Sequence, residues 1–353
     1  MTTRWTAIRA TGAALVIAMG LSGCGGEDPT TTTTTDATIE STRSGPPGPG
    51  GPSMWPLTGV GSENVAQRPA VSVKIENSTK SRPQVGLVEA DIVWEEVVEG
   101  GITRFVATYH SNIPDAVEPV RSVRPMDPAI VAPLDGILAF SGGQGPFIAA
   151  VKRLGTQAVI MDEGDAGFTR DPGRQAPHNV IGSVPAFLEQ ADDERTAPPP
   201  AQFRYAREVG EGSAPQEGET AREVDVRLSR VQRSVWTWDE ESETYLRSEG
   251  AEPSVAADGR RHSARNVIML STEVFNTKWV DPTGAPVPEH RLAGSGGPGL
   301  LVSSGRSIPV RWTKKDLKSP IVLTTGDGDE ARLDPGNTWV ELVPKDSGSW
   351  SVG

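Results

Sequence analysis

Charged side chains interrupt the apolar pattern of one stretch, EEVVEGGITRFVATYH, at residues 95–110. Glu95 and Glu99 precede a pair of glycines, and Arg104 follows them. Two β-rich runs joined by Gly-Gly predict a β-hairpin. With a two-residue turn, Val97 would face Arg104, so that Glu95, Glu99 and Arg104 would project from one face of the hairpin. Such a cluster is either a surface ion-pair set or a polar wall of a binding cleft.

Two more arginines lie in PVRSVRP, where Arg121 and Arg124 flank a serine between two prolines. Proline fixes φ, so the segment would hold its arginines at little entropic cost. In an acidic protein, these guanidinium groups either neutralise Glu95 and Glu99 or bind a carboxylate or phosphate of a ligand. The sequence leaves both interpretations open.

His178 and Asn179 lie in RDPGRQAPHNV, a segment rich in turn residues. Functional side chains concentrate on such loops, and a histidine beside carboxylates can act as a general base. A loop histidine more often bonds to a backbone carbonyl or faces solvent. The other histidines show no metal-ligand spacing, so we expect no metal and no cofactor. The GSGGPG stretch runs into a predicted strand instead of a helix, which argues against a dinucleotide site.

Strands and helices alternate along the part of the chain that carries these residues. RPAVSVKIEN alternates as a half-buried strand, and DPAIVAPLDGILAF predicts a short helix leading into a strand. PFIAAVKRLG and SVPAFLEQADDE predict helices, the first ended by Gly155 and the second capped by Ser183. We therefore expect a mixed N-terminal domain, α+β or α/β, over residues 54–200.

A polar, acidic stretch at about 207–221 predicts a loop between domains. Beyond it, apolar alternations are separated by turn sequences such as GDGD and DPGN. These features predict a mostly-β C-terminal domain over residues 201–353.

The N-terminus predicts export and a lipid anchor. Residues 1–23 combine two arginines with a short apolar core, which is typical of a signal peptide. The segment ends in Leu-Ser-Gly before Cys24, a pattern that resembles the lipobox of bacterial lipoproteins and predicts Cys24 as the lipid-bearing residue. Residues 24–53 hold a threonine run and a Pro/Gly block, so we expect a disordered tether. The protein would thus lie on the extracytoplasmic face of the cell membrane.

Composition restricts the classes of partner. The formal net charge is −12, so we expect no nucleic acid to be bound. Cys24 is the only cysteine, which excludes an internal disulfide, a cysteine-ligated metal site and a cysteine nucleophile elsewhere.

Several stretches between residues 56 and 344 together resemble the YerB-like family, lipoproteins of Gram-positive bacteria with a two-part domain of unknown function. The matching stretches are PLTG, RPAVSVKIENSTKSRPQVGLVEADIVWEEVVEGGITRF, EPVRSVRP, SGGQGP, RQAPHN, RWTKK and DPGNTWVELVP. The resemblance implies an envelope location and two domains, but no established activity. Relatives tend to have a histidine in the strand before the Gly-Gly pair of SGGQGP, at the position where this chain has Phe140.

Three functions are compatible with these patterns. The leading hypothesis is a lipid-anchored protein that binds an anionic or carbohydrate-bearing cell-wall component. A second is a hydrolase of wall glycan or peptide that uses Glu95 or Glu99 as acid or base, assisted by His178. A third is a scaffold for another exported protein, which would use an edge strand of the β-rich domain.

Overall fold

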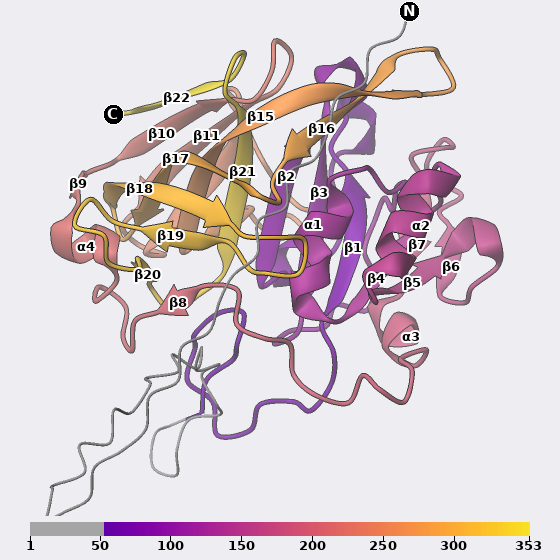
Figure 1. The fold of residues 1–353 in the computed structure, drawn as a ribbon, viewed down its shortest axis with the longest axis horizontal. Coiled ribbons are helices and arrows are strands. Elements are labelled where there is room, and N and C mark those ends of the chain that lie inside the picture. The colour runs from indigo at the N-terminus through magenta and orange to yellow at the C-terminus, as the bar shows by residue number, and fades with distance from the viewer. Residues whose placement is uncertain (1–52) are drawn as a thin grey trace, which may run out of the picture. The chain divides into compact units, whose positions relative to one another are not determined.

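The computed structural model describes residues 53–353, which form one compact unit. The predicted signal peptide, Cys24 and the tether up to residue 52 lie outside the described residues. Two sheets and two short ribbons make up most of the unit (Figure 1). Among residues 53–353, no helix is long and apolar enough to cross a membrane.

The larger sheet has twelve strands, drawn from both ends of the described chain. They are β1 (Val71–Glu76), β2 (Ile92–Val97), β3 (Thr103–Tyr109), β4 (Ile137–Phe140), β5 (Gln157–Ile160), β9 (Glu219–Thr220), β15 (Asn266–Val280), β16 (Pro286–Arg291), β17 (Ser295–Ser303), β18 (Arg306–Lys314), β19 (Val322–Thr324) and β21 (Thr338–Pro344). Their order is β19-β18-β17-β15-β21-β2-β3-β1-β4-β5, with β16 beside β15 and β9 beside β18.

The smaller sheet has six strands and belongs to the C-terminal half of the chain. It consists of β10 (Glu223–Arg227), β11 (Arg233–Asp239), β12 (Thr244–Glu249), β13 (Glu252–Pro253), β14 (Ser263–Ala264) and β22 (Ser349–Val352). The two ribbons pair β6 (Phe168–Arg170) with β7 (Val180–Gly182), and β8 (Arg204–Tyr205) with β20 (Arg332–Leu333).

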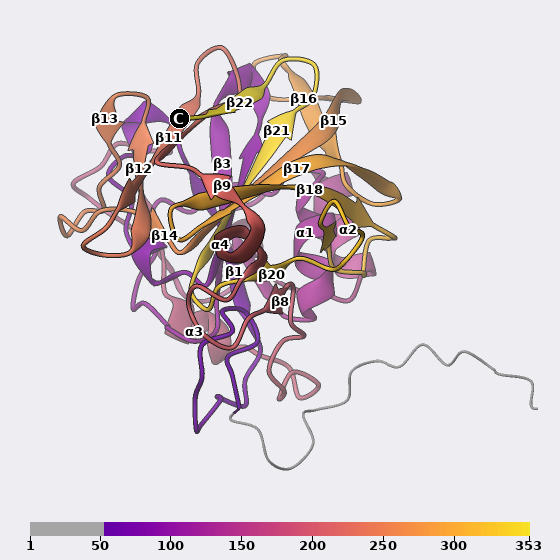
Figure 2. The same cartoon turned by 90° about the vertical axis from the view of Figure 1, so that its left-hand side faces the viewer.

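The helices are short and most of them belong to the N-terminal half. They are α1 (Asp127–Val131), α2 (Gly145–Arg153), α3 (Val184–Leu188) and α4 (Ser213–Glu217). Single 3₁₀ turns occur at Thr79–Ser81, Leu87–Glu89, Glu99–Gly101, Ala132–Leu134 and Met161–Glu163. The prediction of a mixed N-terminal half and a mostly-β C-terminal half is confirmed. The polar stretch at 207–221 contains α4, which packs against β17 and β18 (Figure 2).

The two halves of the chain share the larger sheet. β21 lies between β15 and β2 and runs parallel to both, with Glu95 directly beside Glu341. The predicted boundary near residue 200 therefore separates two segments of sequence whose strands are hydrogen-bonded in one sheet.

Apolar layers cover both faces of the larger sheet. On one face, α1 and α2 pack over Trp94, Leu138 and Phe140. On the other, the smaller sheet and the segment from β6 to α3 pack over residues such as Val73 and Phe105. As a result, every residue of β1, β2 and β3 is buried. The prediction of β1 as half-buried is wrong, because a second layer covers the face that carries its polar residues.

The β2–β3 hairpin has a different register from the predicted one. Its turn is longer than Gly100-Gly101, since Val98 N donates to Ile102 O at 2.9 Å across the Glu99–Gly101 turn. Glu95 consequently faces Phe105, and Glu96 faces Arg104. A shift of one residue exchanges the two faces of a strand. The predicted grouping of Glu95 with Arg104 on one face is therefore wrong.

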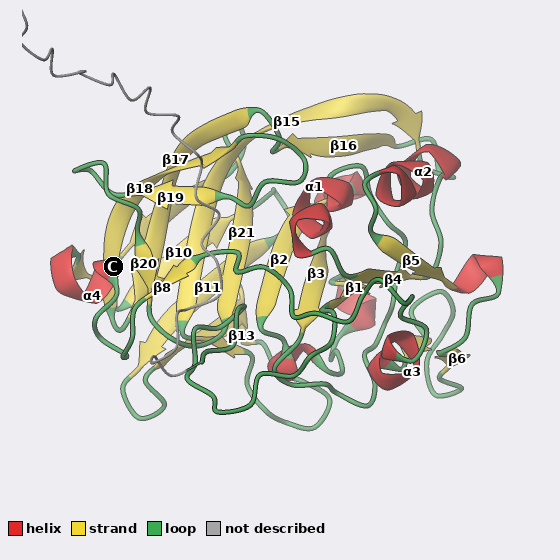
Figure 3. Ribbon diagram, turned by 60° about the horizontal axis from the view of Figure 1, so that its bottom comes forward, coloured by secondary structure: helices red, strands yellow, loops and turns green. Residues whose placement is uncertain are grey.

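One hairpin extends beyond the larger sheet. The second half of β15 pairs with β16 alone, and this arm reaches across to α2 (Figure 3). Gln144 Nε2 donates to Val280 O at 2.8 Å, and Phe147 of α2 lies edge-on to Trp279 with ring centroids 6.5 Å apart. The arm tip thus borders the N-terminal end of α2.

Candidate functional site

Charged residues occupy central strands of the larger sheet and gather in clusters on its two faces. Successive residues of a strand point to opposite faces. Glu95 therefore points toward the smaller sheet, while Lys74, Glu76 and Glu96 point to the side of α1. Since a buried charge is costly unless it is paired, the partners of each one decide what the cluster can do.

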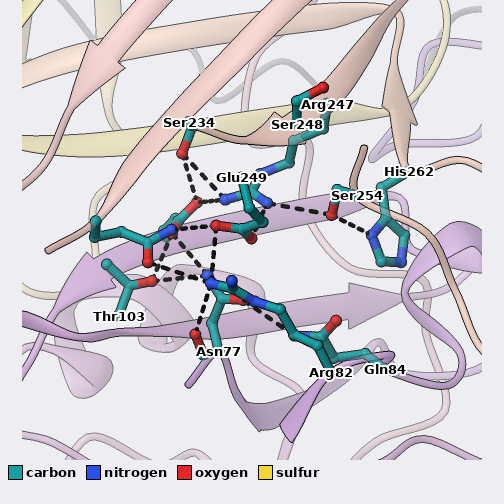
Figure 4. A network of polar contacts seen from close by, with 12 residues as sticks. Asn77, Arg82, Gln84, Thr103, Ser234, Arg247, Ser248, Glu249, Ser254 and His262 are labelled. Atoms are coloured by element: carbon teal, nitrogen blue, oxygen red, sulfur yellow. Dashed lines mark hydrogen bonds and ion pairs between the residues drawn. The ribbon is translucent and has the colours of Figure 1, made fainter. Parts of the chain in front are cut away.

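An inter-sheet cluster lies between the larger and the smaller sheet and is built around Glu95 and Arg247 (Figure 4). Arg247 Nη2 lies 2.6 Å from Glu95 Oε2, and both side chains are fully buried. Arg247 also pairs with Glu249, whose carboxylate lies 2.8 Å from Arg82. Thr103 Oγ1 donates to Glu95 at 2.6 Å.

Aromatic rings enclose the Arg247 guanidinium, with Phe105 and Trp339 at 5.4 and 5.2 Å from its central carbon. Burial and the neighbouring charge of Glu95 raise the pKa of Glu341 well above its ordinary value. Glu95, Arg247 and Glu341 are fully buried and join the two sheets, and only Arg82, at 26% exposure, brings the cluster to the surface.

An arginine cluster lies on the opposite face of the larger sheet and consists of Arg104, Arg121, Arg124, Glu76 and Glu99. Arg124 Nε lies 2.7 Å from Glu99 Oε1, and Arg121 Nε lies 3.1 Å from Glu76 Oε2. These two arginines are partly exposed, with 12% and 20% of the side-chain surface accessible for Arg124 and Arg121, respectively. The cluster therefore reaches the protein surface.

Arg104 is the buried arginine of this cluster, at 5% exposure. Its Nη1 donates to Ser122 O at 2.6 Å, whereas its Nε is buried without a hydrogen-bond partner among residues 53–353. A guanidinium can donate five hydrogen bonds. Burial, together with the charges of Arg124 and Arg121, lowers the pKa of Arg104 to about 9, which still leaves it cationic at neutral pH. An anion beside Arg104 would offset both the missing hydrogen bond and the repulsion.

A buried triad next to this cluster joins β1, β2 and α1. Lys74 pairs with Glu96, and its Nζ lies 2.7 Å from Asp127 Oδ1. Burial and the charge of Asp127 raise the pKa of Glu96 to about 8. Asp127 also accepts from Arg124 N at 2.6 Å, which ties the triad to the arginine cluster.

His178 joins the arginine cluster through Glu76. Its Nδ1 lies 2.9 Å from Glu76 Oε2, the same oxygen that Arg121 contacts. Asn179 is directed elsewhere: it accepts from Arg170 Nη1 at 2.8 Å and donates to Asp171 O at 3.2 Å. Asn179 therefore holds the loop in place and does not line the cluster.

Segments far apart in the sequence meet at the arginine cluster. Arg121 N donates to Lys74 O at 2.8 Å, so that PVRSVRP runs beside β1. Ser141 N donates to Arg121 O at 3.1 Å, which places the SGGQGP loop next to the same segment. At the arm tip, the pKa of Asp281 is lowered. The largest cause is the hydrogen bond from the Thr283 hydroxyl, and the charge of Arg124 contributes more weakly.

Two cavities lie elsewhere on the protein. One, of about 570 Å³, is lined by residues that include Arg207, Val209, Arg265 and Asn337, and one of about 290 Å³ lies beside Val85 and Asp258. No residue of the arginine cluster lines either of them.

The structure brings five of the seven predicted residues of the folded part together: Glu99, Arg104, Arg121, Arg124 and His178. Glu95 lies on the opposite face, and Asn179 points away. Because Glu95 is fully buried against Arg247, it does not share a cleft with Glu99 and His178. A hydrolase that uses Glu95 with His178 is inconsistent with this geometry, whereas one that uses Glu99 with His178 stays a prediction. Phe140 is the last residue of β4 and is fully buried in the apolar core.

Comparison with known proteins gives the chain a family. Residues 57–197 match the N-terminal domain, and residues 224–340 the C-terminal domain, of a family described as "Protein of unknown function (DUF3048)". A Bacillus subtilis protein named "Putative lipoprotein YerB" is 30% identical over 306 residues, which are 84% of this chain and 88% of that protein. The chain belongs to the DUF3048 family.

A solved structure of the family has the same fold. The crystal structure of the YerB protein from Bacillus subtilis matches with a TM-score of 0.70 at 27% identity, and covers 84% of this chain and 99% of the other. The predicted resemblance to the YerB-like family is thus confirmed, and with it the two-part architecture of the DUF3048 family. The family description assigns no activity.

Sequence reasoning missed residues that organise the two clusters and the buried triad, namely Glu76, Glu96, Asp127, Arg247 and Glu341. The half-buried strand predicted for RPAVSVKIEN would have placed Lys74 on a solvent face. Burial of β1 on both faces places Lys74 and Glu76 inside the protein instead. The signal for this burial was that two charged residues, Lys74 and Glu76, lie on β1, a strand that other strands flank on both sides.

Proposed function

We propose that this DUF3048 protein is a lipid-anchored envelope protein that binds an anionic cell-wall ligand at the arginine cluster. The observation that carries the proposal is the buried Arg104 guanidinium, whose Nε has no hydrogen-bond partner among residues 53–353 although two further arginines lie beside it. Guanidinium groups bind carboxylate and phosphate through charge-assisted hydrogen bonds, and exposed parts of Arg121 and Arg124 give such a group access.

The lipid anchor rests on the signal-like residues 1–23, on the lipobox-like segment before Cys24, and on the name of the Bacillus subtilis relative. Acyl chains on Cys24 would hold the protein at the extracytoplasmic face of the membrane. We expect the Cys24→Ser variant to incorporate no labelled palmitate and to be released into the medium. Palmitate incorporation into that variant would contradict the assignment.

The binding proposal is tested with the chain from residue 27 onward, mixed with purified wall material from a Gram-positive host. We expect the protein to be retained on the pellet. Arg121→Gln and Arg124→Gln should each weaken retention about tenfold or more, because each removes hydrogen bonds between charged groups. Arg311→Gln, a change of an exposed arginine on β18, is the matched control and should leave retention unchanged.

Mass spectrometry of the supernatant separates binding from catalysis. The proposal expects retention without released fragments. Retention that is equal for the wild type and for both folded cluster variants would overturn it, and wall fragments in the supernatant would show an enzyme instead.

A further inference from the structure

Glu76 is a fully enclosed carboxylate that holds two side chains at the surface. It is 1% exposed, and it accepts a hydrogen bond from Ser78 Oγ at 2.7 Å. Arg121 Nε and His178 Nδ1 both lie against its Oε2, at 3.1 and 2.9 Å. An ionised carboxylate only accepts hydrogen bonds, so His178 must present a protonated Nδ1 to it.

This tautomer determines the hydrogen-bonding role of the other ring nitrogen of His178, Nε2. When Nδ1 carries the proton of a neutral imidazole, Nε2 carries a lone pair and is a hydrogen-bond acceptor. Nε2 has no hydrogen-bond partner among residues 53–353, and 18% of the side chain is exposed. The free acceptor of His178 is therefore open to a ligand.

The loop that carries His178 is fixed in place. Arg174 donates from Nη1 to Ser81 O at 2.9 Å and lies 3.4 Å from a carboxylate oxygen of Glu118. Arg121 Nη1 donates to Pro177 O at 3.3 Å, so that Arg121 holds this loop both directly and through Glu76. A side chain held in this way can select among ligands, because little entropy is lost when it binds.

The Arg121 guanidinium and the His178 ring thus stand side by side at one carboxylate oxygen of Glu76. We propose, resting on the proposed anion site, that the ligand is a hydroxylated anion: its phosphate or carboxylate binds the arginines, and its neighbouring hydroxyl donates to His178 Nε2. Polyol phosphates and hydroxy acids share this chemistry. His178 is then the residue that distinguishes them from simple anions.

Matched ligand pairs isolate the contribution of the hydroxyl. The chain from residue 27 onward is titrated calorimetrically with glycerol 3-phosphate and propyl phosphate, and with lactate and propionate. We expect the hydroxylated member of one pair to bind about fivefold more tightly, as one added hydrogen bond would give. The pair that shows the difference identifies the anion as phosphate or carboxylate.

The His178→Ala variant should reduce that ratio to about one, whatever its effect on the affinity for the ligand without a hydroxyl. The His178→Gln variant, which keeps an acceptor, should restore part of the preference. A role of His178 that is only structural would instead weaken both members of a pair equally, or neither. Equal unfolding midpoints of the variants and the wild type show that the fold is kept.

The outcomes separate the two proposals. If the wild type binds both members of each pair with equal affinity, the role of His178 is overturned and the anion site stands. If it binds none of the four ligands, the anion site itself is overturned, and the role of His178 with it.

Discussion

Arg104 and Arg247 are both buried but differ in the groups that surround their charge. Arg247 is fully buried, and two glutamates neutralise it. Arg104 is also buried, yet its hydrogen-bond partner among the described residues is a carbonyl, Ser122 O. Paired buried charges stabilise one arrangement of a fold, whereas a cation without full compensation favours an added anion. This difference at the residue level underlies the proposed site.

Glu96 predicts a pH dependence of stability. Its pKa is about 8 in the fold, against 4.5 for an ordinary glutamate, because burial and Asp127 outweigh the attraction of Lys74. The folded state therefore holds a proton that the unfolded state releases, and stability falls as pH rises from about 4.5 to about 8. One proton corresponds to a slope of at most about 1.4 kcal/mol per pH unit.

The Glu96→Gln variant should remove this slope, because glutamine resembles the neutral acid. Urea unfolding at pH 5, 6, 7 and 8 measures the difference in unfolding free energy between wild type and variant. We expect the wild type to lose stability relative to the variant as the pH rises. Glu163→Gln, which changes an exposed partner of Lys152, is the control. A difference between wild type and Glu96→Gln that stays constant with pH would contradict the prediction.

At the scale of the element, the sequence predicts strands and helices better than their register. The alternation of VSVKIE and the capping position of Ser183 identify β1 and α3 correctly. The β2–β3 register depends on whether Gly100 and Gly101 form the whole turn, and both glycines adopt positive φ as part of a longer turn. Local pattern does not determine that length.

The candidate site, too, can be predicted from the sequence only in part. PVRSVRP and the His178 loop are recognisable from their composition, and both reach the arginine cluster. Arg247 enters from β12 in the C-terminal half and takes Glu95 as its partner. No local pattern around either residue predicts that contact, because it depends on the packing of one sheet against the other.

The β15–β16 arm yields a prediction at this scale. A two-stranded hairpin is only marginally stable alone, so its contacts with α2 hold the tip in place. Trp279→Ala should speed limited proteolysis within residues 281–285 and lower the unfolding free energy by about 1 kcal/mol. Phe275→Ala is the matched control, since that ring contacts Arg291 of the arm itself. Equal cleavage rates in the two variants would show that α2 does not hold the tip.

At the scale of the whole molecule, one sheet unites the two halves that the family descriptions separate. β2 has β21 as a neighbour, and Glu95 has Arg247 as its counter-charge; both partners come from the C-terminal half. A fragment that ends near residue 206 would expose the edge of β2 and leave a buried carboxylate unpaired.

We therefore expect residues 53–206 and 207–353, expressed separately, to show no cooperative unfolding transition, while the joined chain unfolds in one. Circular dichroism during urea titration makes the comparison. The opposite result, a cooperative transition of the N-terminal fragment alone, would mean that the shared sheet is not required for folding.

The most direct test of the central claim is an NMR titration of the arginine Nε–H signals of the ¹⁵N-labelled chain from residue 27 onward. The Arg104 signal is assigned by its loss in Arg104→Met, and glycerol 3-phosphate and lactate are then added at constant ionic strength. An anion bound at the arginine cluster should shift the Arg104 signal in a saturable manner and leave that of the exposed Arg311 unchanged. If neither anion shifts the Arg104 signal, or if all arginine signals move together without saturation, the arginine cluster does not bind an anion and the proposed function is wrong.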